Sequence, residues 1–187
     1  EIVRETSVLD WSPAALDKQG YEHYMLKEIH EQPSAMVDTL NGLLDRASAE
    51  SFPLAAQPAV ELLRNAKRIT IVACGTAWHA SLLGKYWLEK WGRIPVSVEL
   101  ASEYRYRDPV VDSGMLVIGV SQSGETADTL AAVREAKKRG ARILSICNVI
   151  GSSLARESDG VLYTHAGPEI GVASTKAYTA QLLMFYL

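Results

Sequence analysis

The sequence has 187 residues, 48% hydrophobic and 22% charged, a composition that excludes general disorder and suffices for one well-packed domain. Its 19 basic and 22 acidic residues give a net charge of −3, with no basic stripe to favour nucleic-acid or anionic-membrane binding. No apolar run reaches the roughly 20 residues of a membrane helix. Two cysteines, Cys74 and Cys147, are too few for a disulfide framework, which fits unpaired thiols in the cytoplasm.

The first third of the chain is predicted to be helical. Residues 1–20 are mixed in composition and read as a linker or arm, and residues 21–67 as N-terminal helices. Apolar residues recur at helical spacing from Tyr21 onward. Pro33 interrupts this pattern, so one helix is expected to end near residue 32 and another to begin there. A loop at 47–56 and a short helix from Pro58 follow.

From residue 68 to 187, short β-branched or apolar runs alternate with helical segments. Such alternation predicts crossover connections and a parallel sheet, and strands without polar alternation predict a sheet covered on both faces. We therefore expect an α/β fold, a three-layer αβα sandwich around a five-stranded parallel sheet, with the N-terminal helices added to it. The predicted strands are residues 68–73, 95–100, 115–120, 142–147 and 160–164; the predicted helices between and after them are 76–91, 125–139, a turn at 152–157, and 172 onward.

The most polar of the loops after a predicted strand is residues 121–126, SQSGET, which we call the serine loop. Four of its side chains can hydrogen-bond an anion, and Gly124 permits a tight turn. The N-terminus of the next helix, predicted to begin at Glu125, carries a partial positive charge suited to phosphate. A plain helix cap is the alternative, but the position beyond a parallel strand favours phosphate binding. The GxxxxGK[ST] pattern of a Walker loop is absent.

Two other strand–loop–helix junctions carry glycine and hydroxyl groups. Thr76 follows Cys74 and Gly75 after the first strand, where it either caps the helix or meets a ligand. Residues 167–176 follow the fifth strand, and their Ser174 and Val172 either belong to a capped helix or form a wall of the same pocket.

Several groups could take part in catalysis or metal binding, but position alone does not favour it. Cys74 and His79 suggest a nucleophile and base, although a packed thiol is the simpler interpretation. Glu169 and Lys176 could act as acid and base. The histidines at positions 23 and 30 have the wrong spacing for a metal site, so packing or a subunit contact is preferred.

Six segments together resemble one family, glutamine–fructose-6-phosphate aminotransferase (isomerizing), also called glucosamine-6-phosphate synthase. The serine loop alone is shared with the wider sugar isomerase (SIS) superfamily, and the first and last segments narrow the resemblance to the synthase. The segments are YEHYMLKEIHEQP, ACGTAWHA, ASEYRYRD, SQSGETADTL, ICNV with IGSSLARESD, and EIGVASTKAYTAQL, within residues 21–184.

The resemblance implies that residues 68–187 are the first SIS subdomain of the isomerase region, with a flavodoxin-like SIS fold. It implies that fructose 6-phosphate or glucosamine 6-phosphate binds here, with no cofactor and no metal. The family often has serine where Ala77 stands, so one sugar contact is expected to be lost or replaced. The implied substrate-binding residues are Ser121, Gln122, Ser123 and Thr126 for the phosphate, Thr76 and Ala77 in the pocket, and Val172 and Ser174 for the sugar.

The resemblance also implies that the catalytic residues lie outside these 187 residues, in a glutaminase domain and a second SIS subdomain. The chain starts without Met and ends within an apolar helical pattern, so a piece of a longer enzyme, inactive alone, is expected. Glu125 is then a helix-start residue and not the isomerising base. A homodimer in the cytoplasm is expected from the family and the apolar N-terminal helices. A sugar-phosphate-sensing module of a regulator and a stand-alone sugar-phosphate isomerase remain alternatives.

Overall fold

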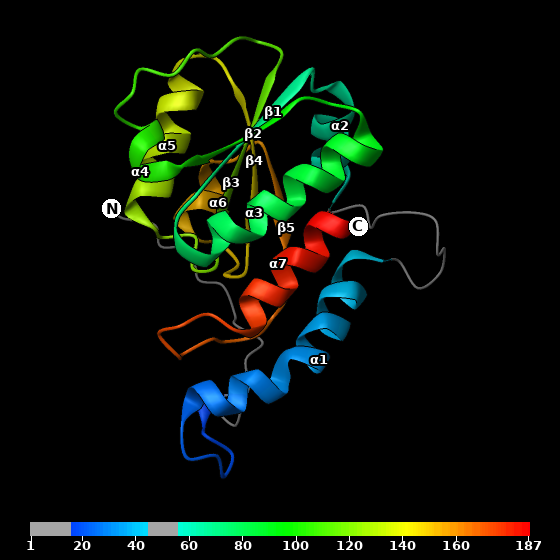
Figure 1. The fold of residues 1–187 in the computed structure, drawn as a ribbon, viewed down its shortest axis with the longest axis vertical. Helices are drawn as coiled ribbons and strands as arrows, with labels where there is room; N and C mark the ends of the chain where they lie inside the picture. The colour runs from blue at the N-terminus through cyan, green and yellow to red at the C-terminus, as the bar shows by residue number, and fades with distance from the viewer. Residues whose placement is uncertain (1–15, 45–55) are drawn as a thin grey trace, which may run out of the picture.

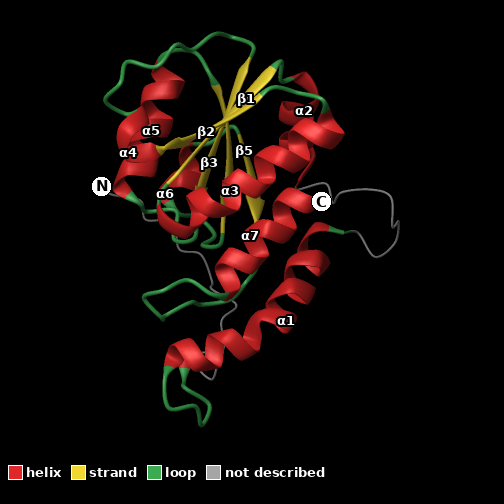
Figure 2. Cartoon of the chain, viewed as in Figure 1, coloured by secondary structure: helices red, strands yellow, loops and turns green. Residues whose placement is uncertain are grey.

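A computed structural model describes residues 16–44 and 56–187. Most of the predicted arm at 1–20 and of the predicted loop at 47–56 lies outside the described residues. The described chain forms a sheet sandwiched between helices, with α1 extending below it (Figures 1 and 2). The strands are β1 (Arg68–Ala73), β2 (Val96–Leu100), β3 (Met115–Ser121), β4 (Arg142–Cys147) and β5 (Gly160–Tyr163). The helices are α1 (Tyr24–Leu43), α2 (Gln57–Asn65), α3 (Gly75–Trp87), the π-helical η3 (Leu88–Gly92), α4 (Ala101–Tyr104), α5 (Ala127–Lys138), α6 (Ser153–Glu157) and α7 (Lys176–Tyr186).

The sheet has five strands in the order β2-β1-β3-β4-β5, and every neighbouring pair is parallel. This confirms the predicted fold class, and each predicted strand matches the observed one to within one residue at either end. The chain leaves β1 toward one edge and returns through β3 toward the other. The carboxyl ends of β1 and β3 therefore flank the point where the strand order reverses, which is where open α/β sheets bind ligands.

Two hydrophobic clusters cover the two faces of the sheet. On one face, Ile71 and Ile118 pack with α7 residues Met184 and Phe185 and with Ala59 of α2. On the other face, Val72, Val117 and Ile143 pack with α4, α5 and α6. Because alternate residues of one strand point to opposite faces, α7 and α5 reach the sheet from opposite sides.

The predicted break at Pro33 is wrong, because α1 continues through it as one helix. Proline has no N–H, so the carbonyl of Ile29 loses its usual helical partner. The Gln32 side chain donates to that carbonyl over 3.0 Å and replaces the missing bond. Helix α1 packs against α7, and it bends part-way along its length (Figure 1), as prolines cause helices to do.

In the first half of α1, the buried side chains are not the apolar ones. Met25 and Ile29 are exposed, whereas Lys27 and Glu28 are only 2% exposed. Glu28 recurs at helical spacing with the buried Ala35 and other small or apolar residues further along α1. The side chains of Lys27 and Glu28 must therefore have polar partners within the protein.

The helices differ from the predictions in four places. Helix α4 was not predicted, and α3 ends at Trp87 and continues as η3, after which Arg93 takes a left-handed φ of 52°. Helix α5 begins at Ala127, with Thr126 at the N-cap position, because the serine loop continues in non-helical conformation. Helix α7 begins at Lys176. No helix in the described ranges is long and apolar enough to cross a membrane.

Candidate functional site

A polar cavity of about 210 Å³ lies at the carboxyl ends of β1 and β3. Three loops surround it: the start of α3, the serine loop, and residues 167–175, which we call the Glu169 loop. All eight predicted site residues line this one cavity; the full lining is Cys74, Thr76, Ala77, Val120, Ser121, Gln122, Ser123, Thr126, Glu169, Gly171, Val172, Ser174 and Gln181. The structure thus brings the predicted residues together, and their role as ligand contacts stays a prediction.

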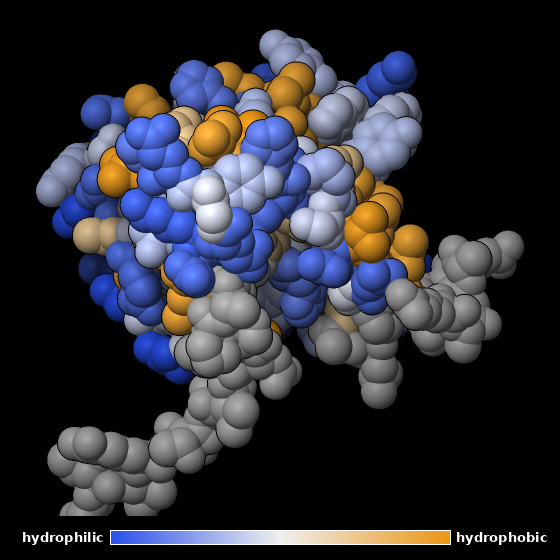
Figure 3. Space-filling model, turned by 90° about the horizontal axis from the view of Figure 1, so that it is seen from below, coloured by the Kyte–Doolittle hydropathy of each residue, from blue (hydrophilic) through white to orange (hydrophobic). Residues whose placement is uncertain are grey.

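A second cavity, of about 280 Å³, lies among α2, α3, η3 and α7. Its lining is almost entirely apolar, with Trp87, Trp91 and Phe185 among its residues. It offers no cluster of hydrogen-bonding groups, so the polar cavity is the better candidate for a phosphate ester. Viewed from below, the described surface is mostly hydrophilic (Figure 3).

The serine loop is held by its own hydrogen bonds. Ser121 is 3% exposed, and its Oγ accepts the Gly124 N–H over 3.0 Å and lies 2.9 Å from Thr126 Oγ1. Ser123 Oγ accepts the Glu125 N–H over 3.1 Å. These bonds leave the Ser123 hydroxyl proton available to a ligand. The loop is therefore preorganised, and its hydroxyls lie at the positive end of α5.

The only charged residue in the cavity lining among the described residues is Glu169, and the lining contains no lysine or arginine. Backbone N–H groups and hydroxyls would neutralise an anion in this arrangement.

Gly124 and α6 hold the outer side of the serine loop. Gly124 has a φ of 66°, and a Cβ there would lie 2.1 Å from Ser152 Oγ, so only glycine fits. Its carbonyl accepts the Leu154 N–H over 3.0 Å. Glu125 Oε1 accepts the Ser153 N–H over 2.7 Å, and this bond holds the pKa of the Glu125 carboxyl below its usual value. Glu125 thus joins two loops, away from the cavity lining.

Glu169 caps the N-terminus of α7. Its Oε1 accepts the N–H groups of Thr175 over 2.8 Å and Ala177 over 3.1 Å, and its Oε2 accepts the Ser174 hydroxyl over 3.1 Å. A carboxylate at this position compensates the free N–H groups and the positive helix end. The Ser174 proton points to Glu169, so its lone pairs remain for a donor in the cavity.

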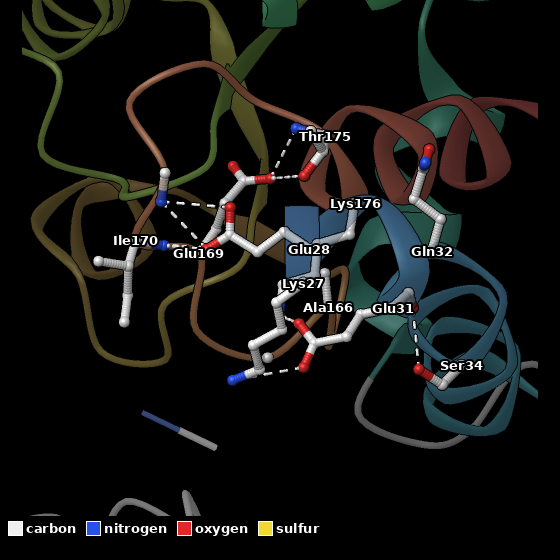
Figure 4. Close-up of polar contacts among 12 residues, drawn as sticks. Lys27, Glu28, Glu31, Gln32, Ser34, Ala166, Glu169, Ile170, Thr175 and Lys176 are labelled. Atoms are coloured by element: carbon white, nitrogen blue, oxygen red, sulfur yellow. Dashed lines mark hydrogen bonds and ion pairs between the residues drawn. The ribbon is translucent and has the colours of Figure 1, made fainter. Parts of the chain in front are cut away.

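Glu28 of α1 holds the backbone of the same loop (Figure 4). Its carboxylate accepts the Ile170 N–H over 2.6 Å and the Gly171 N–H over 3.0 Å. Ile170 and Gly171 immediately precede Val172, whose side chain is fully exposed. Two buried or half-buried carboxylates, Glu28 and Glu169, therefore fix the backbone on both sides of the predicted sugar contacts.

Lys176 is 4% exposed and pairs with Glu31 of α1 over 2.7 Å. Glu31 also lies 3.5 Å from Lys27, whose Nζ donates to the Asp17 carbonyl over 2.6 Å. These contacts join α1 to the start of α7 (Figure 4). The structure therefore gives Glu169 and Lys176 structural partners, and it does not place them as an acid–base pair.

Asn148 connects the loops after β4 and β5 to the serine loop. Its N–H donates to the Gln122 carbonyl over 3.0 Å. Its Oδ1 accepts the Ala166 N–H over 2.7 Å, and its Nδ2 donates to the Gly167 carbonyl over 2.7 Å. A shift of the serine loop would thus displace Asn148 and, through it, the start of the Glu169 loop.

The remaining candidate residues are not clustered. Both cysteines are free, and burial raises the pKa of the Cys147 thiol to about 11. His79 is exposed beside Trp78, His23 lies 3.5 Å from Glu22, and His30 stacks on Tyr21 with ring centroids 5.5 Å apart. The described residues contain no group of three or more His, Cys, Asp or Glu side chains able to hold a metal.

Sequence reasoning missed three residues at this site: Glu28, Asn148 and Gln181. The signal for Glu28 was its helical spacing with Ala35 and Thr39, which marks the buried face of α1. No spacing in the sequence marked Gln181, because α7 begins only at Lys176, after Ser174. Asn148 stands directly after a strand, as Ser121 stands at the end of one.

A five-stranded parallel sheet with a polar cavity at its carboxyl edge is the arrangement of a ligand-binding α/β domain. Comparison with known families identifies which α/β family this is. The family model described as SIS domain matches residues 62–187. The chain belongs to the SIS domain family.

Within that family, the chain matches the isomerase region of glutamine–fructose-6-phosphate aminotransferases. It is 55% identical to the enzyme of Streptomyces coelicolor over 96% of the chain and 29% of that protein. It is 52% identical to the enzyme of Clostridium tetani over the whole chain and 31% of that protein. Among solved structures, the C-terminal domain of the Francisella tularensis enzyme superposes with a TM-score of 0.84 at 51% identity, covering 91% of this chain and 47% of that one. The chain thus spans less than a third of the length of these curated relatives.

Proposed function

We propose that this chain binds a hexose 6-phosphate, fructose 6-phosphate, as the first SIS subdomain of a glucosamine-6-phosphate synthase. The observation that carries this proposal is the convergence of the serine loop, the start of α3 and the Glu169 loop on one polar cavity. Identity above 50% along nearly the whole chain supports the choice of family.

The chemistry of the cavity suits a phosphate ester of a sugar. The serine loop offers hydroxyls and the N-terminus of α5 to the phosphate. On the opposite side, Ser174 and the backbone beside Val172 offer acceptors and donors to sugar hydroxyls. The phosphate is then held at the α5 end, and the sugar extends toward α7.

In the parent enzyme, fructose 6-phosphate and glutamine would become glucosamine 6-phosphate and glutamate. Aldose–ketose rearrangement of this kind proceeds by proton transfer. The residues of this chain bind and orient the sugar phosphate, while the groups that move protons belong to other parts of the parent. We therefore expect the isolated chain to make no glucosamine 6-phosphate, and measurable production would contradict this assignment.

Binding is tested by calorimetric titration of the full chain with fructose 6-phosphate. Ser123→Ala and Thr126→Ala each remove a hydroxyl from the serine loop. Hydrogen bonds to a charged group contribute about 1.5–3 kcal/mol, so each variant is expected to bind roughly 10- to 100-fold more weakly. Ser34→Ala is the control, because that hydroxyl donates to the Glu31 carbonyl on the exposed side of α1.

Unchanged affinity in Ser123→Ala and Thr126→Ala would overturn the assignment of the cavity. Binding of a different sugar phosphate in preference to fructose 6-phosphate would favour the regulator or the stand-alone isomerase instead. A sensing module would not need the rest of a synthase, so the sequence flanking this chain separates these alternatives.

A further inference from the structure

Gln181 lies on α7 in the lining of the polar cavity and is 2% exposed. Its Oε1 is buried and has no hydrogen-bond partner among the described residues. A buried amide oxygen without a partner costs roughly 1–3 kcal/mol, and native proteins keep such groups rarely. Packing alone therefore does not explain why a glutamine, with its unpartnered amide oxygen, is buried at position 181.

Five other buried side-chain atoms also lack partners in the described part of the chain. None of their residues lines the polar cavity, so Gln181 alone among the six combines an unpartnered amide with a place at the candidate site. The other five atoms are Arg68 Nε, Trp78 Nε1, Tyr104 Oη, Thr129 Oγ1 and Ser145 Oγ.

The location of Gln181 indicates which part of a ligand it meets. It comes from α7, which packs on α1 and α3, whereas the serine loop leads into α5 on the other face of the sheet. The two groups approach the cavity from opposite sides. A ligand whose phosphate lies at the N-terminus of α5 extends its sugar toward Gln181.

We propose that the Gln181 carboxamide is a further substrate-binding group, whose Oε1 accepts a hydrogen bond from a sugar hydroxyl. Hydroxyl groups both donate and accept, so one sugar hydroxyl can satisfy the buried oxygen. Ser174, on the same side of the cavity, directs its proton to Glu169 and offers only lone pairs. The α7 side of the cavity therefore presents two acceptors, which selects a polyhydroxylated ligand. This inference rests on the proposed function, since it assigns the sugar end of the same ligand.

The test compares fructose 6-phosphate with inorganic phosphate as ligands of the full chain, by titration followed with amide NMR signals. Gln181→Met keeps an unbranched side chain of similar length and removes the amide. We expect it to bind fructose 6-phosphate about ten-fold more weakly, the effect of one buried hydrogen bond, and to bind inorganic phosphate as the wild type does. Ser123→Ala, by contrast, should weaken both ligands.

Thermal unfolding without ligand gives a second readout that a purely structural role would not produce. Because the Oε1 of Gln181 is unpartnered in the protein itself, Gln181→Met should unfold at the same or a higher temperature than the wild type. Met184→Leu, a conservative change at a buried position one turn along α7, is the control and should alter neither ligand. If Gln181→Met does not fold, Gln181→Asn, which retracts the amide by one methylene, should show the same selective weakening.

Three results would overturn the inference. The first is wild-type affinity of Gln181→Met for fructose 6-phosphate, and the second is an equal loss of affinity for both ligands. The third is a lower unfolding temperature in Gln181→Met together with wild-type affinity of Gln181→Asn for both ligands. A wild-type chain that binds neither ligand would overturn the proposed function, and this inference with it. Retained wild-type binding with an unaffected Gln181→Met overturns the inference alone.

Discussion

The serine loop and the Glu169 loop form two walls of one cavity, but they are held in different ways. The serine loop is stabilised by hydrogen bonds within its own six residues and by α6, about 30 residues away. The Glu169 loop is capped by its own Glu169 and depends also on Glu28, which is 142 residues from Ile170 in the sequence. One wall is thus a local structure and the other a tertiary one. A loop held by nearby residues can be predicted from a short motif. A loop held by a distant helix can lose its conformation when that helix is altered.

Among changes that separate the two loops, Gly124→Ala is expected to have the largest effect on stability and on phosphate binding. The left-handed φ of 66° and the 2.1 Å approach of a Cβ to Ser152 Oγ both oppose a side chain here. Left-handed backbone costs an L-residue about 1–2 kcal/mol and overpacking about 1–3 kcal/mol, so a loss of about 3 kcal/mol is expected in chemical denaturation, with loss of phosphate binding.

Gly151→Ala is the matched control for this change. Gly151 has a similar φ of 70°, but a Cβ there meets nothing within 4 Å. Only the backbone cost should remain, about 1 kcal/mol. Equal destabilisation by the two variants would show that the contact with Ser152 does not hold the serine loop.

The next largest effect is expected from Glu28→Leu, which removes the tertiary anchor. The N–H groups of Ile170 and Gly171 lose their acceptor, and leaving each of these part-buried donors unsatisfied costs about 1 kcal/mol or more. We expect about 2–3 kcal/mol of destabilisation by chemical denaturation and weaker fructose 6-phosphate binding. Inorganic phosphate should still bind, because the hydrogen bonds that hold the serine loop come from its own residues and from α6.

Glu22→Leu, at an exposed position before α1, is the control for Glu28→Leu and should change stability by less than about 0.5 kcal/mol. If Glu28→Leu abolishes phosphate binding as completely as Gly124→Ala does, the two walls are not independent.

A smaller effect, in reaction rate, is expected at the cysteines. Cys74 is half-buried in the cavity lining, whereas Cys147 is buried with a pKa raised to about 11 by desolvation. The thiolate is the reactive form, so at pH 8 Cys147 should resist iodoacetamide until the protein unfolds. Fructose 6-phosphate should slow the alkylation of Cys74 several-fold. Mass spectrometry of the labelled peptides measures both, and equal labelling of the two thiols in the folded protein would be evidence against this arrangement.

The smallest effect concerns Glu125, the exposed counterpart of Glu28. The pKa of its carboxyl in the folded protein lies below the usual value of 4.5 because it accepts the Ser153 N–H. Its contribution to stability is therefore present above pH of about 4.5 and is lost as the pH falls through the lowered folded pKa. NMR titration of the carboxyl carbon should give a midpoint below 4.5, and Glu125→Gln should leave sugar-phosphate affinity nearly unchanged. A midpoint at or above the ordinary value would mean that the bond to Ser153 does not persist in solution.

The sheet and the serine loop could be predicted from the sequence because their determinants are local. Strands such as Arg68–Ala73 are continuous apolar or β-branched runs, and the position of Ser121 after one of them follows from parallel topology. The predicted residues of the serine loop and of the start of α3 line one cavity for the same reason.

The anchors of the site could not be predicted, because their determinants are not local. A buried Glu28 contradicts the usual exposure of charged residues. Its partners are backbone N–H groups, which every residue type except proline has, so no residue type in the sequence identifies them. Pro33 suggested a break, but the Gln32 side chain and packing on α7 keep α1 continuous. The role of Glu169 as a cap also stayed hidden, because it stands six residues before Thr175 rather than at the N-cap itself.

The contact between Glu28 and Ile170 also bears on the order in which the molecule is made. The two residues are 142 positions apart, and synthesis at about 5–20 residues per second separates their appearance by roughly 7–30 seconds. During that interval the carboxylate of Glu28 remains hydrated, and α1 has no α7 to pack on. The sheet up to β4 can assemble first on the nascent chain. The contact between Glu28 and the Glu169 loop therefore forms later than contacts among the strands that precede the loop, and the cavity is completed only after residues 167–175 have been synthesised.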